Sequence, residues 1–133
     1  MPKTIIQAAI LPAPPDRLFD MYLDPVAHGS FTGAPVVIGS QPGAPFKAYD
    51  DMISGTILQV VPKRLIVQSW RAAHWADEDI DSTLILTFWP DEEGCRIELI
   101  HVNVADDDFA GVSQGWQDYY WEPWREYLEE LQK

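Results

Sequence analysis

The chain has 133 residues, with 9 Lys and Arg against 21 Asp and Glu, which gives a formal net charge of −12. This excess of negative charge repels phosphate backbones and anionic lipid, so we expect neither nucleic acid nor a membrane surface as a partner. No apolar run approaches the ~20 residues of a membrane span, and the weakly apolar start ends at Pro12, too early for a secretory signal. We therefore expect a cytoplasmic protein.

The first part of the chain predicts one strand and two short helices. Residues 4–11 are β-prone and stop at Pro12. A helix follows from Pro14-Pro15, because proline is tolerated in a first helical turn. Asp24-Pro25 then starts a second helix, since Asp is a good N-cap and Pro a good first helical residue. We expect this second helix to end near Gly29.

The middle of the chain has the pattern of an antiparallel meander. Short runs of β-branched and aromatic residues alternate with clusters of Gly, Pro and Asp, which favour turns. The expected strands are residues 36–38, 46–49, 53–61, 65–71, 82–89 and 95–104.

Residues 109–131 predict a long final helix that is unusually rich in aromatic residues. Aromatic side chains lose freedom in a helix, so such a helix needs a large surface on which to pack. Pro123 lies inside the helix and leaves the Tyr119 carbonyl without its amide donor, so we expect a kink there. The spacing predicts one buried stripe along the helix: Trp116, Tyr120, Trp124, Tyr127 and Leu131.

The order of the elements predicts the fold class. Helices at the two ends, with strands between them, are typical of an α+β fold in which the helices pack on one face of an antiparallel sheet. The chain shows no repeat or linker, so we expect residues 1–133 to form one domain. A sheet that curls around a long helix leaves a cavity between the two.

Strand alternation predicts which side chains face that helix, because successive side chains point to opposite faces of a sheet. The choice places His101, a single imidazole, among apolar neighbours. The inward sets are Ile66, Gln68 and Trp70 in the 65–71 strand, Leu84, Leu86 and Phe88 in the next strand, and Ile97, Leu99 and His101 in the last.

The polar side chains give no strong catalytic or metal-binding signal. His28, His74 and His101 lie in three different elements without the close spacing of metal ligands, so we predict no metal site and no cofactor. Two interpretations of His101 stay open: a general base in a dry pocket, or a core histidine bonded to Tyr119, Tyr120 or Gln68. Cys95, the only cysteine, is interpreted as a small core residue.

Short motifs along nearly the whole chain resemble one known family. They are Phe31-Thr32-Gly33-Ala34-Pro35, Pro42-Gly43-Ala44-Pro45-Phe46, Ser54-Gly55-Thr56-Ile57-Leu58, Val61-Pro62-Lys63-Arg64-Leu65-Ile66, Trp70-Arg71 and Gln114-Gly115-Trp116. In their order and spacing the chain resembles the AHSA-type family, named after the activator of heat-shock protein 90 ATPase, within the START/Bet v-like SRPBCC superfamily. The resemblance implies a helix-grip fold, in which a curled antiparallel sheet wraps around a long C-terminal helix and encloses a hydrophobic cavity.

The first functional hypothesis is a small-molecule binding domain with an apolar or aromatic ligand between the sheet and the last helix. The polar loop 74–79 surrounds an exposed-looking Trp75 and is interpreted as a lid, a pocket rim or a protein contact. The expected ligand-binding residues are Phe19, Tyr22, Phe31, Trp70, Trp75, Leu86, Phe88, His101, Trp116 and Tyr120.

Two other functions stay open. One is a chaperone-associated protein-interaction module that uses the acidic surface, because the chain resembles the C-terminal domain of the ATPase activator. The other is a cyclase- or hydrolase-like enzyme with His101 as its base, since relatives with this fold host such chemistry. We assign no catalytic residue and expect a monomer or a homodimer.

Overall fold

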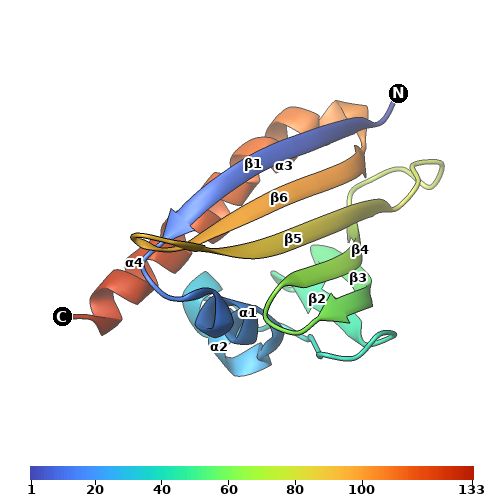
Figure 1. Ribbon diagram of the computed structural model, residues 1–133. Helices are drawn as coiled ribbons and strands as arrows, with labels where there is room; N and C mark the ends of the chain where they lie inside the picture. The colour runs from blue at the N-terminus through green and yellow to red at the C-terminus, as the bar shows by residue number, and fades with distance from the viewer.

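All six strands belong to one antiparallel sheet in the computed structural model, which describes residues 1–133. The order across the sheet is β1-β6-β5-β4-β3-β2, so the first strand lies beside the last and β2 forms the other edge (Figure 1). The strands are β1 (Lys3–Leu11), β2 (Pro45–Ala48), β3 (Ile53–Val61), β4 (Leu65–Ala72), β5 (Ser82–Asp91) and β6 (Gly94–Val104).

The helices pack against this sheet in two groups (Figure 1). The last helix runs along one face of the sheet, and the two short helices contact β5, β6 and the second half of that helix. The structure confirms the predicted α+β helix-grip arrangement. The helical elements are α1 (Pro15–Leu23), α2 (Pro25–Thr32), a 3-10 turn η1 (Asp106–Asp108), α3 (Phe109–Trp116), a π-helical segment η2 (Gln117–Trp121) and α4 (Glu122–Leu131).

The start of α2 follows the prediction, but its end does not. Asp24 caps the helix, since its carboxylate accepts the Val26 amide at 3.1 Å. The helix then continues to Thr32 rather than ending near Gly29. It ends where Gly33 adopts a left-handed φ of 79° and donates its amide to the Gly29 carbonyl at 2.9 Å. A side chain at this position would be strained, so Gly33, not Gly29, is the terminating glycine.

Strand register confirms the predicted inward-facing residues. Leu84 is paired with His101 and Leu86 with Leu99 across β5 and β6, and partners in a register share one face of the sheet. The same face continues into β4 through the pair of Gln68 and Leu84. The predicted inward residues are all buried: Ile66, Gln68, Trp70, Leu84, Leu86, Phe88, Ile97, Leu99 and His101.

One glycine permits an unusually close approach between β3 and β4. A Cβ atom added to Gly55 would lie 1.9 Å from the backbone oxygen of Ser69, a distance that no side chain tolerates. Next to it, the Thr56 amide donates to the Ser69 hydroxyl at 2.9 Å, and the register shifts between Ile57 and Gln59. An irregularity of this kind bends a strand and increases its twist. This part of the sheet therefore curls toward the last helix.

The predicted strand at residues 36–38 is wrong. Only Val37 pairs with another strand, through an isolated bridge in which it exchanges two backbone hydrogen bonds of 2.9 Å with Lys47. The flanking Pro35 and Gly39 favour irregular backbone, and β2 offers an edge of only four residues. The segment therefore adds one bridge to the edge of the sheet and no further strand.

The last helix contains a π-helical segment that the sequence analysis missed. Segment η2 directly precedes α4, near the kink expected at Pro123. A π-turn takes one more residue than an α-turn, so it moves the buried face of α4 along the sequence by about one position. Leu128 is accordingly fully buried, whereas the predicted Tyr127 is half-buried and Leu131 is 52% exposed. The buried stripe is Trp116, Tyr120, Trp121, Trp124 and Leu128.

The interior is one apolar cluster of 32 buried residues. Cys95 belongs to it, in agreement with its interpretation as a small core residue, and burial raises the pKa of its thiol to about 11. None of the helices combines the length and the apolar character that crossing a membrane requires.

Candidate functional site

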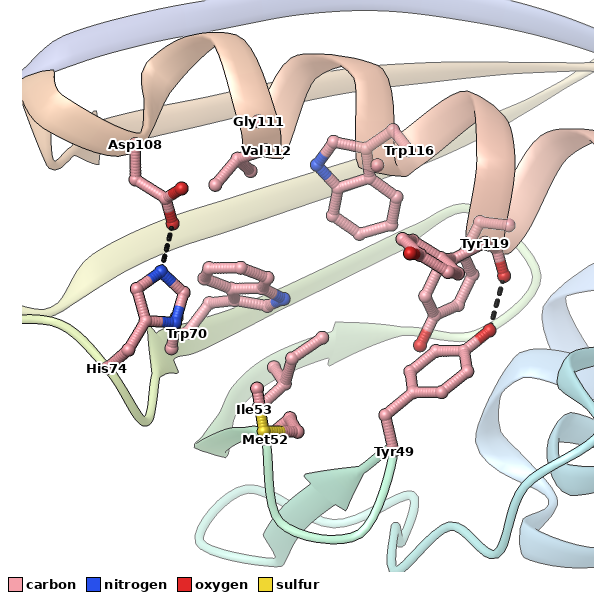
Figure 2. A pocket seen from close by; sticks show the side chains of 13 residues that line it. Tyr49, Met52, Ile53, Trp70, His74, Asp108, Gly111, Val112, Trp116 and Tyr119 are labelled. Atoms are coloured by element: carbon pink, nitrogen blue, oxygen red, sulfur yellow. Dashed lines mark hydrogen bonds and ion pairs between the residues drawn. The ribbon is translucent and has the colours of Figure 1, made fainter.

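A pocket of about 370 Å³ lies between the first half of the last helix and the β3–β4 side of the sheet (Figure 2). One wall comes from the turn between β2 and β3, from β3, from β4 and from the loop after β4. The other wall comes from η1, α3 and η2. The lining residues are Tyr49, Met52, Ile53, Trp70, Ala72, His74, Asp108, Gly111, Val112, Gly115, Trp116, Tyr119 and Tyr120.

Small residues on α3 leave the space for this pocket. Gly111 and Gly115 are one helical turn apart and both line it. A Cβ atom on Gly115 would meet only the Tyr119 ring, at an ordinary contact distance of 3.6 Å. Ala72 is the small residue on the opposite wall. The pocket therefore exists because the facing positions of helix and sheet carry little side-chain volume.

Trp70 forms the centre of the sheet wall. It is 6% exposed and its ring lies against Trp75, His101 and Trp116, with ring centroids 5.6, 4.8 and 6.5 Å apart. Figure 2 shows its indole nitrogen pointing into the pocket, and no protein atom accepts its hydrogen. A buried donor without an acceptor carries a desolvation cost, so this N–H is a polar group presented to the pocket.

Two tyrosines close one end of the pocket through the backbone of η2. The Tyr49 hydroxyl donates to the Tyr119 carbonyl at 2.7 Å, and the two rings meet edge to face with centroids 5.5 Å apart (Figure 2). This carbonyl lies four residues before Pro123, which has no amide hydrogen to give it. The hydroxyl thus supplies a donor that the helix lacks, and partial burial raises the pKa of Tyr49 to about 12.

The opposite end of the pocket is acidic. Asp108 Oδ2 accepts the Trp75 indole N–H at 2.8 Å and lies 3.0 Å from His74 Nε2 (Figure 2). Arg71 holds the same loop in place by donating to the carbonyl of Asp79 at 2.7 Å. These bonds draw the Trp75 ring inward, so it is only 7% exposed, and the expectation of an exposed tryptophan is wrong.

His101 lies behind the pocket wall with both ring nitrogens in hydrogen bonds. Trp116 donates its indole N–H to Nδ1 at 3.2 Å, so the ring proton is on Nε2, which donates to the Ser82 hydroxyl at 2.8 Å. That hydroxyl donates to the Trp70 carbonyl at 2.5 Å. Burial lowers the pKa of His101 to about 3. The imidazole is a neutral core residue with no free lone pair, and its partners are not the three predicted ones.

A second buried histidine lies at the other end of the interior, where the sequence gave no spacing signal. His28 Nδ1 donates to the Tyr22 carbonyl at 2.7 Å, and its Nε2 accepts the Tyr120 hydroxyl at 2.8 Å. The Tyr22 hydroxyl donates to the Gln68 side chain at 2.6 Å. Burial lowers the pKa of His28 to about 4. This network fixes the back of Tyr120, whose ring lines the pocket.

The structure brings only part of the predicted ligand site to the pocket. Trp70, Trp116 and Tyr120 line it. The other predicted residues are buried against protein atoms outside its lining, because rings from α1 and α2 and from the sheet fill the space between them: Phe19, Tyr22, Phe31, Trp75, Leu86, Phe88 and His101. A ligand role for any of these ten residues remains a prediction.

Several lining residues escaped the sequence analysis. Asp108 was interpreted as part of a solvated loop, and Tyr49 and Met52 lie in a turn that carries no functional motif. Gly111 and Gly115 did offer a signal, since two glycines one turn apart beside Trp116 indicate a helix face with little bulk. The structure contains no group of three or more His, Cys, Asp and Glu side chains placed to hold a metal ion.

Comparison with known proteins places this geometry in a family. The chain is 27% identical over 108 residues to the human activator of 90 kDa heat shock protein ATPase homolog 1, a match that covers 81% of this chain and 32% of that protein. The chain thus spans about a third of the length of this relative.

Solved structures support the fold. A protein from Mesorhizobium loti superposes with a TM-score of 0.82 at 18% identity, covering 96% of this chain and 98% of that one. An HSP90 activator from Plasmodium falciparum superposes with a TM-score of 0.79 at 19% identity, covering 88% and 89%. The sequence model of one family matches residues 12–129, and the chain therefore belongs to the activator of Hsp90 ATPase homolog 1-like (AHSA1) proteins.

Proposed function

We propose that the protein binds a small apolar or aromatic molecule in the pocket between α3 and the β3–β4 side of the sheet. The observation that carries this proposal is the pocket itself, whose volume of about 370 Å³ lies within the range of ligand sites in proteins, roughly 300–1,000 Å³. A well-packed interior leaves few voids larger than a water molecule. An opening of this size between two glycines and a wall of rings therefore favours a guest molecule over a packing defect.

The lining indicates the chemistry of the guest. Nine of the 13 lining residues are hydrophobic. Trp70 and Trp116 present rings from sheet and helix, and Tyr49, Tyr119 and Tyr120 close the far end (Figure 2). Rings placed at mixed angles suit a flat aromatic guest, because stacked and edge-to-face contacts both become available.

The test of this proposal fills the pocket without disturbing the core. Gly115→Leu places a side chain in the pocket from α3, and it also favours helix formation. The matched control is Ala110→Leu, which adds similar bulk at an exposed position of the same helix. The probe is 2-(1-naphthyloxy)ethanol, a neutral aromatic ether, and its binding is measured by isothermal titration calorimetry.

We expect the wild type and Ala110→Leu to bind the probe equally and Gly115→Leu to lose at least tenfold in affinity, a cost of about 1.4 kcal/mol. Circular dichroism and urea unfolding check that both variants keep the fold. The proposal fails if the wild type does not bind the probe, or if Gly115→Leu binds it as tightly as the control does.

A second candidate function is association with a heat-shock protein 90 chaperone. The observations in its favour are membership of the AHSA1 family and the 27% identity to the human ATPase activator. The acidic surface, with a net charge of −12, suits a basic docking face. Titration of the chain into a chaperone ATPase assay tests this candidate, and an unchanged ATPase rate with no binding in calorimetry argues against it.

A further inference from the structure

The charge around the pocket is of one sign. Asp108 is the only acidic residue in the lining, and no Lys or Arg contributes to it. An adjoining hollow of about 200 Å³ shares His74 and Asp108 and adds Asp79 and Asp107. His74 is the only side chain of either lining that can become positively charged near neutral pH. The acidic end of the pocket therefore disfavours an anionic guest.

Asp108 has one carboxylate oxygen that the protein does not use. Oδ2 receives both protein donors, the Trp75 indole and the His74 imidazole, whereas Oδ1 accepts no hydrogen bond. Oδ1 lies 3.0 Å from the position that a Cβ atom on Gly111 would occupy. The glycine thus keeps the pocket side of Oδ1 clear. A carboxylate oxygen without a protein donor, at the rim of an apolar pocket, is a site for a positively charged donor.

The rings of the lining favour a cation as well. The faces of Trp and Tyr rings carry negative charge density, which attracts ammonium groups placed over them. Five such rings line this pocket: Tyr49, Trp70, Trp116, Tyr119 and Tyr120. Pairs of them are inclined to one another by 38 to 77° and do not stack flat, so the pocket meets ring faces from several directions.

The unpartnered indole N–H of Trp70 indicates a polar atom on the same guest. This side chain is more than nine-tenths buried, and its nitrogen points into the pocket between Trp116 and Ile53 (Figure 2). A guest with an oxygen acceptor at this point would remove the desolvation cost of the free donor. Together, the two unused polar groups of the lining predict a cation at one end of the guest and an acceptor near its middle.

We infer that the pocket selects an aromatic amine, whose ammonium group lies at Asp108 Oδ1, whose rings lie among the five aromatic side chains, and whose oxygen accepts the Trp70 N–H. This inference rests on the proposed ligand-binding function and narrows it to organic cations. Neutral molecules of the same shape bind more weakly, and carboxylates bind most weakly of all.

A series of probes with one skeleton tests the charge preference. They are 2-(1-naphthyloxy)ethylamine, 2-(1-naphthyloxy)ethanol and (1-naphthyloxy)acetate, which are positive, neutral and negative near neutral pH. By calorimetry at low salt, we expect the amine to bind the wild type about tenfold more tightly than the alcohol. The acetate should bind more weakly than the alcohol. If the alcohol binds and the amine shows no advantage, the inference falls while the proposed function stands.

Two variants locate the preference in the pocket. Asp108→Asn keeps an oxygen for the Trp75 indole and should reduce the advantage of the amine to less than about threefold, with the affinity of the alcohol unchanged. Met52→Lys adds a positive charge at a lining position that is 51% exposed, so the fold tolerates it, and it should weaken the amine and strengthen the acetate. Met52→Leu is its matched control. An amine advantage that survives both charge variants overturns the assignment to Asp108.

The role of Trp70 is tested by replacing the ether oxygen of the amine with a methylene group, as in 3-(1-naphthyl)propylamine. Loss of one hydrogen bond should weaken binding about fivefold in the wild type. Trp70→Phe keeps a ring on the wall but has no N–H, and it should bind both amines equally. Equal binding of the two amines by the wild type would refute the oxygen contact.

Discussion

The two ends of the interior between sheet and last helix are built differently. At one end α1 and α2 cover the sheet, and ring packs on ring: Phe31 stacks on Trp124 with centroids 4.3 Å apart and on His28 at 5.1 Å. At the other end only a turn and a loop cover the sheet, and Trp70 and Trp116 face a pocket. The difference teaches that an aromatic helix face becomes core or pocket wall according to what lies opposite it.

The largest expected effect breaks this comparison on the helix itself. Trp124→Ala removes a fully buried ring from the closed end and should destabilise the protein by about 3–5 kcal/mol, through lost burial and a residual cavity. Tyr119→Ala, at a lining residue that is 58% exposed, should cost less than about 1 kcal/mol. Urea unfolding measures both free energies. Similar losses for the two variants would mean that the ends do not differ in packing.

The next effect concerns pH, and here the two ends should behave alike. Burial lowers the pKa of His28 to about 4 and that of His101 to about 3, from an ordinary 6.5. The unfolded chain therefore takes up protons that the folded chain refuses. Stability from these residues is complete above pH ~6.5 and is lost as the pH falls toward the folded values, by about 2 kcal/mol for each histidine near pH 5.

Urea unfolding at neutral pH and near pH 5 measures this loss. His28→Gln and His101→Gln should each remove about half of the pH dependence, although each variant also loses hydrogen bonds and is less stable at neutral pH. A wild-type stability that stays constant between these two pH values would contradict the neutral, buried state of both imidazoles.

The smallest effect sharpens the description of the pocket end. Tyr49→Phe removes the hydroxyl that donates to the Tyr119 carbonyl and should cost about 1 kcal/mol. It should also speed amide hydrogen exchange in η2 and the start of α4. Tyr127→Phe is the matched control, since no hydrogen bond of its hydroxyl is present to be lost. Equal stability of the two variants would show that the bond does not fasten the pocket end.

The sequence predicted the fold where the physics is local and periodic. Alternation in β4, β5 and β6 gave the inward faces correctly, because a strand has a fixed period of two. The caps and prolines placed the starts of α1 and α2. Prediction failed at residues 36–38, where the short β2 edge offered a single pairing partner. It also failed at Tyr127, where one π-turn changed the helical phase.

The candidate site was harder to predict, because a pocket depends on volumes that oppose one another across the interior. Trp70, Trp116 and Tyr120 could be named, since periodicity tells which rings point inward. Periodicity does not tell whether an inward ring meets another ring or a gap. Phe31 and Trp116 read alike in the sequence, yet Phe31 meets Trp124 and Trp116 borders the space left by Gly115.

The π-helical segment has a consequence for how the gene can change length. Its additional residue sets the rotation of everything after it, at about 100° per residue. A one-residue deletion within Gln117–Trp121 that restored an α-helix would turn Trp124 and Leu128 away from the sheet, whereas the same deletion after Leu128 would leave the buried face intact. Deletions tolerated at the C-terminal end of the chain should therefore be lethal to folding a few residues earlier.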